Sequence, residues 1–295
     1  MRLSVIVPAF NEERRLGAGL DQITSYLRTK KYEWEVLVVD DGSVDGTMAI
    51  ADQYHRQYPR IRVMGNGANF GKGYSVRRGM IAAEGEFRLF TDADLSTPIR
   101  ELDRFWPQFD AGHKVVIGSR AVSDSFVRVH QPWYREQMGR VFNRFVQAIA
   151  LPGIHDTQCG FKAFTAEAAQ KVFSLCRIPG FGFDVESLYL ARKLGFRTAE
   201  VGVEWVNSPA TKVSAMRDAT TMFIDLLRVR AADRRGDYEA PAPGAWTGPL
   251  PRKNIPRRER PPAQPAVTGS APVSAPGRPP KRGFFRRPRG GRAKR

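Results

Sequence analysis

The amino-acid sequence predicts an α/β fold with a mostly parallel central sheet flanked by helices. Short apolar runs alternate four times with helical patterns between residues 2 and 95, and this alternation is typical of parallel sheets with helical crossovers. Polar segments follow the apolar runs directly, at "PAFNE", "DDGS", "NFGKG" and "DAD". Because ligands of open α/β sheets bind beyond the carboxyl ends of the strands, we expect these segments to meet in one site.

Each element is justified by its own periodicity. A continuous β-branched apolar run indicates a strand buried on both faces, and apolar residues spaced by three and four indicate an amphipathic helix. By these criteria we expect strands over residues 2–10, 34–43, 61–66, 86–95, 114–120 and 198–205, and a loop entering a strand over 156–164. We expect helices over residues 16–27, 46–58, 72–85, 133–151, 184–195 and 219–234.

The positive charge of the chain is concentrated at its C-terminal end. The 295 residues carry a formal net charge of +17, of which residues 231–295 contribute +12 together with 13 of the 21 prolines. Such a composition buries too little apolar surface to offset the entropy lost on folding. We therefore expect one domain over residues 1–238, followed by a disordered Pro/Arg-rich basic tail over 239–295.

Several classes of protein are disfavoured by simple patterns. The two cysteines, Cys159 and Cys176, stand far apart without a CxxC motif, which argues against a disulfide framework or a zinc site. The N-terminal residues lack the core and the cleavage site of a signal peptide, and no run approaches the ~18 apolar residues of a spanning helix. We expect a cytoplasmic protein that is soluble or peripheral on a membrane.

The "DAD" segment places two carboxylates, Asp92 and Asp94, one residue apart at the end of an expected strand. A divalent cation would offset their repulsion, and Mg²⁺ or Mn²⁺ prefers one or two carboxylates together with phosphate oxygens and water. The alternative is that one aspartate caps the next helix while the other is solvated. The other polar segments at strand ends favour the metal site.

Two further strand-end segments contain candidate nucleotide ligands. Asp40 and Asp41 follow an apolar run, where carboxylates can accept hydrogen bonds from a nucleobase or a ribose, whereas Asp45 fits a turn or a helix cap. The segment "GNGANFGKGYS" does not have the spacing of a phosphate-binding P-loop. Its glycines still permit a close backbone approach to a nucleotide, and Lys72 is either a donor contact or a solvated charge.

Arginines and a second acidic pair complete the candidates. Arg120 and Arg135 can clamp phosphates, because a guanidinium binds them bidentately and keeps its charge, although any single arginine is more often a surface residue. Asp184 and Glu186 stand at an expected helix start. They can serve as a general base or only favour the helix dipole.

The motifs together resemble the family 2 glycosyltransferases, and within them the dolichyl-phosphate (polyprenyl-phosphate) β-glucosyltransferases. The resemblance covers roughly residues 2–230, and seven motifs occur in the family's order: "SVIVPAFNE", "VVDDGSVDGT", "NFGKGYSVRRGM", "TDADLSTP", "VIGSR", "DTQCGFKAF" and "FDVESLYLA". The seven-residue "DTQCGFK" pattern favours the glucosyl branch over the mannosyl branch.

This resemblance implies a GT-A fold, a nucleotide-sugar donor and Mg²⁺ or Mn²⁺. The positions matching the family's nucleotide-binding residues are Pro8, Asn11, Glu12, Asp40 and Asp41. Asp92 and Asp94 match its metal-binding D-x-D, Arg120 matches a basic residue near the transferring phosphates, and Arg135 matches the arginine of the acceptor phosphate. Ser96 departs from the glutamine that is frequent in the mannosyl branch, which leaves the third metal contact open.

The implied activity is that of an inverting hexosyltransferase, which moves a hexose, glucose first of all, from a UDP-sugar to a polyprenyl or dolichyl phosphate. A phosphate with a second pKa of about 6 is already ionised near neutrality, so the acceptor needs orientation by arginines rather than a strong base. Asp94, Arg120 and Arg135 are then the catalytic candidates.

Three alternatives to this function stand beside it. The acceptor can be a polysaccharide or protein hydroxyl, with Asp184 or Glu186 as base, or the transfer can be of mannose from GDP-mannose. From a different class, the basic tail can bind nucleic acid or a partner, although the domain itself shows no nucleic-acid motif.

A lipid acceptor also implies contact with a membrane surface. The helix expected over residues 133–151 has an apolar stripe with arginines beside it, which suits either a membrane interface or packing on the domain. The basic tail can add attraction to an anionic leaflet. We therefore expect a peripheral protein on the cytoplasmic face of a membrane.

Overall fold

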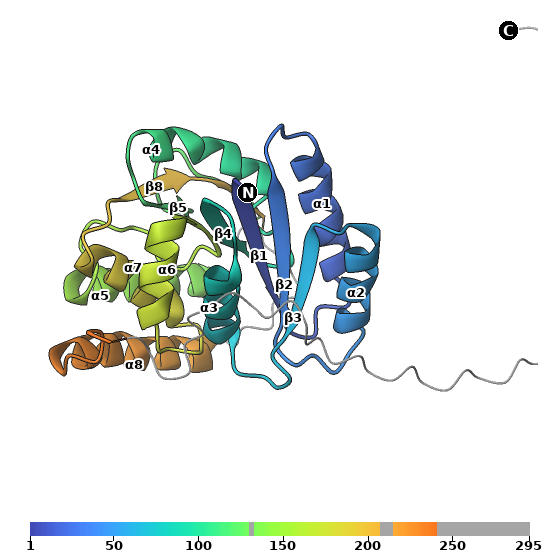
Figure 1. Ribbon diagram of the computed structural model, residues 1–295. Coiled ribbons are helices and arrows are strands. Elements are labelled where there is room, and N and C mark those ends of the chain that lie inside the picture. The colour runs from blue at the N-terminus through green and yellow to red at the C-terminus, as the bar shows by residue number, and fades with distance from the viewer. Residues whose placement is uncertain (130–132, 207–214, 241–295) are drawn as a thin grey trace, which may run out of the picture. The chain divides into compact units, whose positions relative to one another are not determined.

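A computed structural model gives the fold over residues 1–129, 133–206 and 215–240 (Figure 1). Side chains are described for these residues except 128–129, 133–136, 140 and 215–220. The predicted tail lies outside the described residues from 241 onward, so its disorder and its binding of any partner stay predictions.

The described residues form a seven-stranded sheet with the order β3-β2-β1-β4-β7-β5-β8. Its strands are β1 Leu3–Ala9, β2 Trp34–Asp40, β3 Ile61–Gly65, β4 Phe87–Thr91, β5 Val115–Ser119, β7 Phe161–Thr165 and β8 Thr198–Gly202. A separate two-stranded sheet pairs β6 (Phe126–Val129) with β9 (Glu204–Val206).

The sheet is mostly parallel, as predicted. Strands β3, β2, β1 and β4 run parallel to one another, and so do β5 and β8. Only β7, among these seven strands, runs antiparallel, and it lies between β4 and β5. The carboxyl ends of β1, β2 and β4 therefore meet at one edge of the sheet, where Ala9 pairs in register with Asp40.

The helices flank this sheet, and all of them except η1, α4 and α6 correspond to helices expected from the sequence. They are α1 Leu16–Arg28, α2 Thr47–Gln57, α3 Lys72–Ala82, the 3-10 helix η1 Ile99–Arg104, α4 Trp106–Asp110, α5 Trp133–Ile149, α6 Ala166–Leu175, α7 Phe183–Lys193 and α8 Ala215–Arg234. Helices α1 and α2 pack side by side next to the β2–β3 edge (Figure 1).

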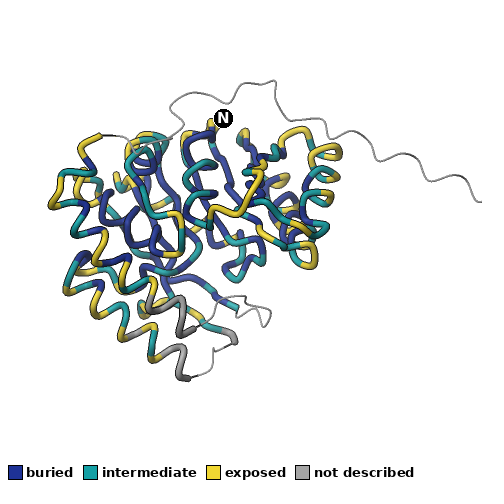
Figure 2. The backbone as a smooth tube through the Cα atoms, turned by 90° about the horizontal axis from the view of Figure 1, so that it is seen from below, coloured by how far each residue is buried: buried dark blue, intermediate teal, exposed yellow. Residues whose placement is uncertain are grey.

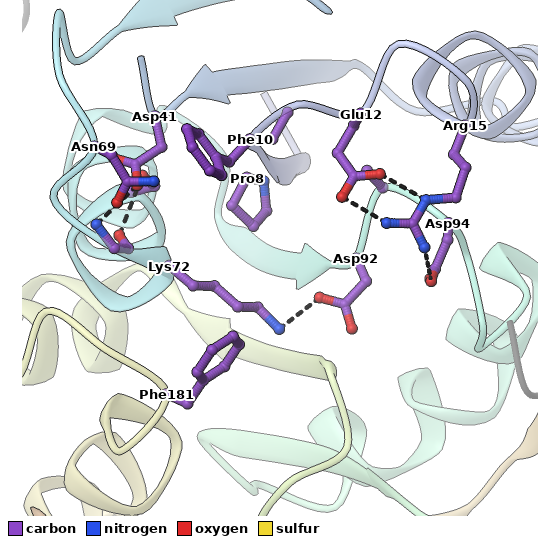
Figure 3. A pocket seen from close by; sticks show the side chains of 14 residues that line it. Pro8, Phe10, Glu12, Arg15, Asp41, Asn69, Lys72, Asp92, Asp94 and Phe181 are labelled. Carbon is purple, nitrogen blue, oxygen red and sulfur yellow. Dashed lines mark hydrogen bonds and ion pairs between the residues drawn. The ribbon is translucent and has the colours of Figure 1, made fainter. Parts of the chain in front are cut away.

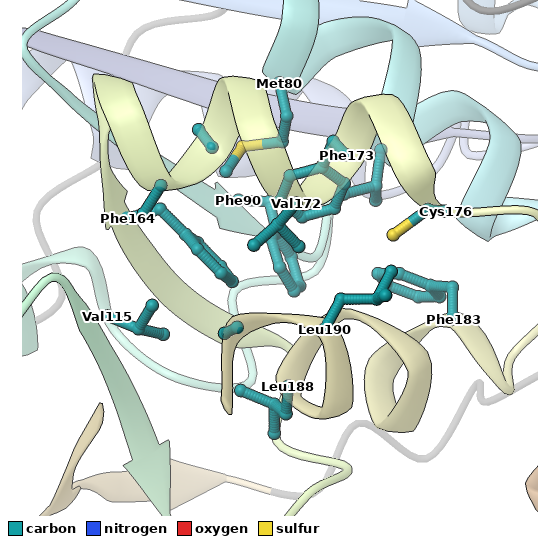
Figure 4. Packing of buried hydrophobic residues seen from close by; sticks show 14 of the residues in the cluster. Met80, Phe90, Val115, Phe164, Val172, Phe173, Cys176, Phe183, Leu188 and Leu190 are labelled. Atoms are coloured by element: carbon teal, nitrogen blue, oxygen red, sulfur yellow. The ribbon is translucent and has the colours of Figure 1, made fainter. Parts of the chain in front are cut away.

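The strands divide the core into two clusters, one on each face of the sheet. Along β1, Val5 and Val7 pack with α1, whereas Ile6 packs with α3 on the other face, as the two-residue period of a strand requires. Figure 4 shows the second cluster, in which Phe90 and Phe164 meet side chains of α6 and α7. Burial on both faces explains the continuous apolar runs in the sequence, and Figure 2 shows the buried strands inside a more exposed helical layer.

Two local expectations were wrong. Residues 198–205 form two strands rather than one, because the amide of Val203 donates to the carbonyl of Ser119 (3.1 Å) and β9 turns away to pair with β6. Helix α3 ends at Ala82 rather than at Gly85. The amide of Gly85 instead donates to Oγ of Ser4 (2.8 Å), and a Cβ there would lie 2.5 Å from the Ser4 nitrogen.

The helix predicted over residues 133–151 is confirmed as α5, and its partner is α8. Val146 of α5 and Val229 of α8 are fully buried in the core cluster, so one side of each helix packs on the domain. Across the described ranges, no helix is both long enough and apolar enough to cross a bilayer.

Candidate active site

A pocket of about 320 Å³ opens at the carboxyl ends of β1, β2 and β4 (Figure 3). Its walls come from the polar segments that follow these strands, from the start of α3 and from the loop before α7. The lining residues are Pro8, Ala9, Phe10, Glu12, Arg15, Asp41, Asn69, Gly71, Lys72, Ser75, Asp92, Ala93, Asp94 and Phe181. The predicted meeting of "PAFNE", "DDGS", "NFGKG" and "DAD" is thus found in the structure.

The aspartates of the D-x-D segment both line this pocket, and each is bound to a cation from another element. Oδ1 of Asp92 lies 2.6 Å from Nζ of Lys72. Oδ2 of Asp94 lies 3.1 Å from Nη1 of Arg15, and its Oδ1 accepts hydrogen bonds from the amide and hydroxyl of Ser96 (3.1 and 3.0 Å). The repulsion between the two carboxylates is therefore offset by two side chains that face the pocket.

Lys72 and Arg15 are held as cations by their surroundings. Burial favours the neutral amine of Lys72, but the charges of Asp92 and Asp184 outweigh it and keep the pKa of Lys72 above its ordinary value. Arg15 donates from Nε and Nη2 to the two carboxylate oxygens of Glu12, both at 2.6 Å. Glu12 thereby fixes the arginine that reaches Asp94.

Asp41 organises the glycine-containing loop that leads into α3. Its Oδ2 accepts from the amide of Gly71 (2.7 Å), and its Oδ1 accepts from the amide of Phe70 (3.1 Å) and from Nδ2 of Asn66 (2.7 Å). Gly71 has a φ of 102°, and a Cβ at this position would lie 2.5 Å from the carbonyl oxygen of Pro179. The loop accordingly needs glycine to approach both Asp41 and the loop before α7.

Asp40 and Asn11 stand beside the pocket rather than among its lining residues. Asp40 is 2% exposed. Its Oδ2 accepts from the amide of Ser43 (3.2 Å), and its buried Oδ1 has no hydrogen-bond partner among the described residues. Asn11 has a φ of 54° and its Oδ1 accepts from the amide of Val44 (2.9 Å). Asn11 thus ties the loop after β1 to the loop after β2.

Gly160 is a functional candidate that sequence reasoning did not single out. A Cβ on this residue would lie 2.1 Å from Oδ2 of Asp92, so the loop before β7 packs directly against the carboxylate. The signal was present as the glycine of "DTQCGFK", but its long-range contact was not visible in the sequence. The loop therefore limits the positions that the Asp92 side chain can adopt.

Arg120 supports that loop and does not line the pocket. Its Nε and Nη2 donate to the two oxygens of Asp156 (2.7 and 2.9 Å), and its amide also donates to Asp156 (2.9 Å). Burial opposes ionisation of Asp156, but Arg120 outweighs it and holds the pKa of Asp156 below its ordinary value. The backbone of Arg135 lies in α5, and its side chain is outside the described residues.

The two candidate bases are engaged in the interior. Asp184 is 3% exposed and forms an ion pair with the fully buried Lys162, which also donates to the carbonyl of Cys159 (2.6 Å). Glu186 is fully buried and accepts from the amides of Arg177 and Ile178, both at 2.9 Å. Burial raises the pKa of both carboxyls, and neither is a lining residue of the pocket.

The oxygen ligands in the pocket suit a hard divalent cation that also binds a phosphate oxygen of the nucleotide. Asp92 and Asp94 supply carboxylate oxygens, and in the described part of the chain no cluster of three or more His, Cys, Asp or Glu residues is placed to hold a metal. A site with two carboxylates leaves further positions for phosphate oxygens and water, as Mg²⁺ and Mn²⁺ prefer. The orphaned Oδ1 of Asp40 is buried, in the residue that directly precedes the lining residue Asp41.

Comparisons with known proteins agree with this geometry. The Glycosyl transferase family 2 model matches residues 4–173. The chain is 37% identical to a dolichyl-phosphate beta-glucosyltransferase of Dictyostelium discoideum, over 77% of this chain and 73% of that protein. It is 35% identical to a human protein of the same name, over 78% and 75% of the two chains, and 31% identical to the Saccharomyces cerevisiae protein of that name, over 80% and 76%.

Solved structures resemble the fold at lower identity. Glucosyl-3-phosphoglycerate synthase from Mycobacterium tuberculosis, in complex with Mn²⁺, UDP-glucose and phosphoglyceric acid, has a TM-score of 0.59 at 22% identity, covering 82% of each chain. The same enzyme with Mn²⁺, UDP and glucosyl-3-phosphoglycerate gives 0.59 at 21% identity, again covering 82% of each chain. These neighbours identify the fold as GT-A.

Proposed function

The chain belongs to glycosyl transferase family 2, and from this premise we propose that it transfers glucose from UDP-glucose to the phosphate of a dolichyl or other polyprenyl phosphate. The observation that carries the proposal is the identity of 31–37%, over at least 77% of the chain, to relatives named dolichyl-phosphate beta-glucosyltransferase. The pocket supports it, because the residues that gather there suit a nucleotide diphosphate and a cation.

The polar groups of the pocket support its use as the donor site. We propose that the nucleotide lies over Pro8 and Asp41, close to the orphaned oxygen of Asp40, with its diphosphate towards Lys72. Asn11 contributes by holding the two strand-end loops together. Neighbours solved with Mn²⁺ and UDP-glucose support the same class of donor and ion.

Asp92 and Asp94 are the residues that would hold Mg²⁺ or Mn²⁺. When bound, such an ion supplies neutralisation of the negative charge on the leaving diphosphate. The protein's own part is to keep both carboxylates at the pocket. Arg15 and Ser96 orient Asp94, and the loop at Gly160 limits the position of Asp92.

The acceptor is an oxyanion that needs orientation rather than deprotonation. One nonbridging oxygen of the lipid phosphate attacks the anomeric carbon of glucose, the bond from that carbon to the UDP oxygen breaks, and UDP leaves with the bonding electron pair. A single displacement of this kind inverts the anomeric configuration. We propose that Arg135 orients the acceptor phosphate, and that Arg120 acts by fixing the Asp156 loop.

The alternative hydroxyl acceptor fits the pocket less well. A hydroxyl needs a general base at the reacting atoms, but Asp184 is paired with Lys162 and Glu186 binds backbone amides, and neither lines the pocket. A phosphate acceptor requires no such group. The positions of these carboxylates therefore favour the lipid phosphate over a polysaccharide or protein acceptor.

We further propose that α5 and α8 face the membrane that carries the lipid, on its cytoplasmic side. Among the described side chains of these two helices, the most exposed large apolar ones are each between 44% and 49% exposed: Val141, Phe145, Ile224 and Leu227. Arg144 and Arg228 are exposed on the same two helices. Apolar side chains accompanied by arginines suit an interface with anionic lipid, and co-sedimentation with anionic vesicles tests this contact.

The experiment for the whole proposal incubates the purified chain with polyprenyl phosphate, Mn²⁺ or Mg²⁺, and a panel of labelled UDP- and GDP-sugars. We expect label in the chloroform-soluble product from UDP-glucose, and much less from GDP-mannose. Label appearing only from GDP-mannose would overturn the choice of sugar. Transfer to a polysaccharide or protein with polyprenyl phosphate inert would overturn the acceptor.

A further inference from the structure

The two aspartates of the D-x-D segment are not equivalent in how their cations are held. Arg15, which binds Asp94, is also fixed by two hydrogen bonds to Glu12, and Asp94 is also bound by Ser96. Lys72 reaches Asp92 from the first residue of α3 (Figure 3). Both partners of the Arg15–Asp94 pair are therefore held by further hydrogen bonds. The Lys72–Asp92 pair instead joins a flexible side chain to a carboxylate at the end of a strand.

The Lys72–Asp92 pair is also the more exposed of the two at its carboxylate. The side chain of Asp92 is 37% exposed, against 17% for Asp94. An ammonium on a four-carbon stem can rotate to a new acceptor while keeping its charge. The pair can thus open without moving α3 or β4.

Lys72 and a divalent cation cannot both bind Asp92 in the same way. Nζ of Lys72 lies 2.6 Å from Oδ1 of Asp92, while the Gly160 loop stands against Oδ2. A cation that binds Oδ1 of this carboxylate competes with the ammonium. The displaced ammonium stays beside the pocket, where a diphosphate would give it a new anionic partner.

We propose that Lys72 is the resident counter-cation of Asp92, and that it exchanges this carboxylate for the nucleotide diphosphate when cation and nucleotide bind together. Lys72 thereby makes the binding of each ligand depend on the other, and such coupling is reciprocal by thermodynamic necessity. The inference rests on the proposed function in one respect, that a nucleotide diphosphate and a divalent cation share this pocket.

A positioning role of this kind is separable from a structural one. If Lys72 only fixed the start of α3, its loss would weaken every ligand. If Lys72 competes with the cation, its loss strengthens cation binding in the absence of nucleotide, and weakens nucleotide binding in the absence of cation. One substitution then changes the affinities for the cation and for the nucleotide in opposite directions.

The test uses the full chain and measures binding rather than turnover. Mn²⁺ binding is followed by the electron paramagnetic resonance signal of the free ion, with and without UDP. UDP binding is followed by calorimetry in a chelator. Four proteins are compared: the wild type, Lys72→Met, Lys72→Arg, and Lys30→Met as the control. Lys30 follows α1 and forms an ion pair with Asp103 of η1 (2.8 Å), and neither residue lines the pocket.

We expect Lys72→Met to tighten Mn²⁺ binding without UDP by about tenfold, to weaken metal-free UDP binding by about tenfold, and to reduce the cooperativity between them. Lys72→Arg keeps a cation at the site and should retain weak Mn²⁺ binding without UDP. Lys30→Met should match the wild type, and thermal unfolding of each variant confirms that it is folded.

The inference would be overturned if Lys72→Met bound Mn²⁺ no more tightly than the wild type, or if it kept the full cooperativity. If Lys72→Met does not fold, Lys72→Arg becomes the deciding variant. Tenfold tighter Mn²⁺ binding by Lys72→Arg would then overturn the proposal. A wild type that binds neither UDP nor Mn²⁺ would overturn the proposed function and the inference with it.

Discussion

The packing of Gly160 against Asp92 predicts that Gly160→Ala disables the site without unfolding the domain. The new Cβ would stand 2.1 Å from Oδ2 of Asp92, whereas ordinary contacts begin at 3.4 Å. The carboxylate would therefore have to move by about 1.3 Å. A misplacement of ~1 Å at a reacting centre costs about 100-fold in rate, and we expect a loss of this order in glucose transfer.

The same geometry predicts little change in stability. The atom that gives way is the end of a flexible side chain rather than backbone, and Gly160 is not among the residues with positive φ. The assay compares the initial rate of glucose transfer, Mn²⁺ binding in the presence of UDP, and the thermal unfolding midpoint. Gly180→Ala is the matched control, because a Cβ at Gly180 meets nothing within 4 Å.

We expect Gly180→Ala to retain the wild-type rate and Gly160→Ala to lose rate and Mn²⁺ affinity at an unchanged midpoint. A Gly160→Ala protein with a rate within about threefold of the wild type would refute the claim that this loop sets the position of Asp92.

Two further predictions concern the interior. Lys162→Met should destabilise the domain by about 3–5 kcal/mol, because it leaves the Asp184 carboxyl buried without its cation; a loss below about 1 kcal/mol in urea unfolding would contradict this. The raised pKa of that carboxyl should make the variant more stable at pH 5 than at pH 8, since stability from a raised pKa is lost as pH rises. Burial raises the pKa of Cys159 to about 11 and that of Cys176 above its ordinary value of 9.0, so both thiols should resist iodoacetamide in the native state at pH 9. Labelling as fast as in urea would show that they are accessible.

The sequence was sufficient to predict most strands of the sheet and most of the residues that line the pocket. Continuous apolar runs identify buried parallel strands, and the carboxyl ends of such strands share one edge, so Asp41, Lys72, Asp92 and Asp94 were expected together and line one pocket. The resemblance to the family pointed to Pro8 and Glu12 in the same way. The first set of predictions depended on local periodicity, which a single sequence displays, whereas Pro8 and Glu12 depended on the resemblance alone.

The remaining features depend on contacts between residues far apart in the chain. The ion pair of Arg15 with Asp94 spans 79 positions, and the packing of Gly160 on Asp92 spans 68. The place of β7 between β4 and β5 is set by tertiary pairing rather than by its own apolar pattern. Four-residue strands such as β6 also give too few positions for a period to show.

The central claim is that Asp94 belongs to a cation site that serves glucose transfer to a lipid phosphate. The direct measurement is the rate at which labelled glucose passes from UDP-glucose into chloroform-soluble polyprenyl-phosphate product, for the wild type and for Asp94→Asn at equal concentrations of folded protein. We predict product from the wild type that a chelator abolishes, and a loss of at least about 100-fold in Asp94→Asn with an unchanged unfolding midpoint. Equal rates in the two proteins, or a wild-type rate that is indifferent to the chelator, would contradict the account.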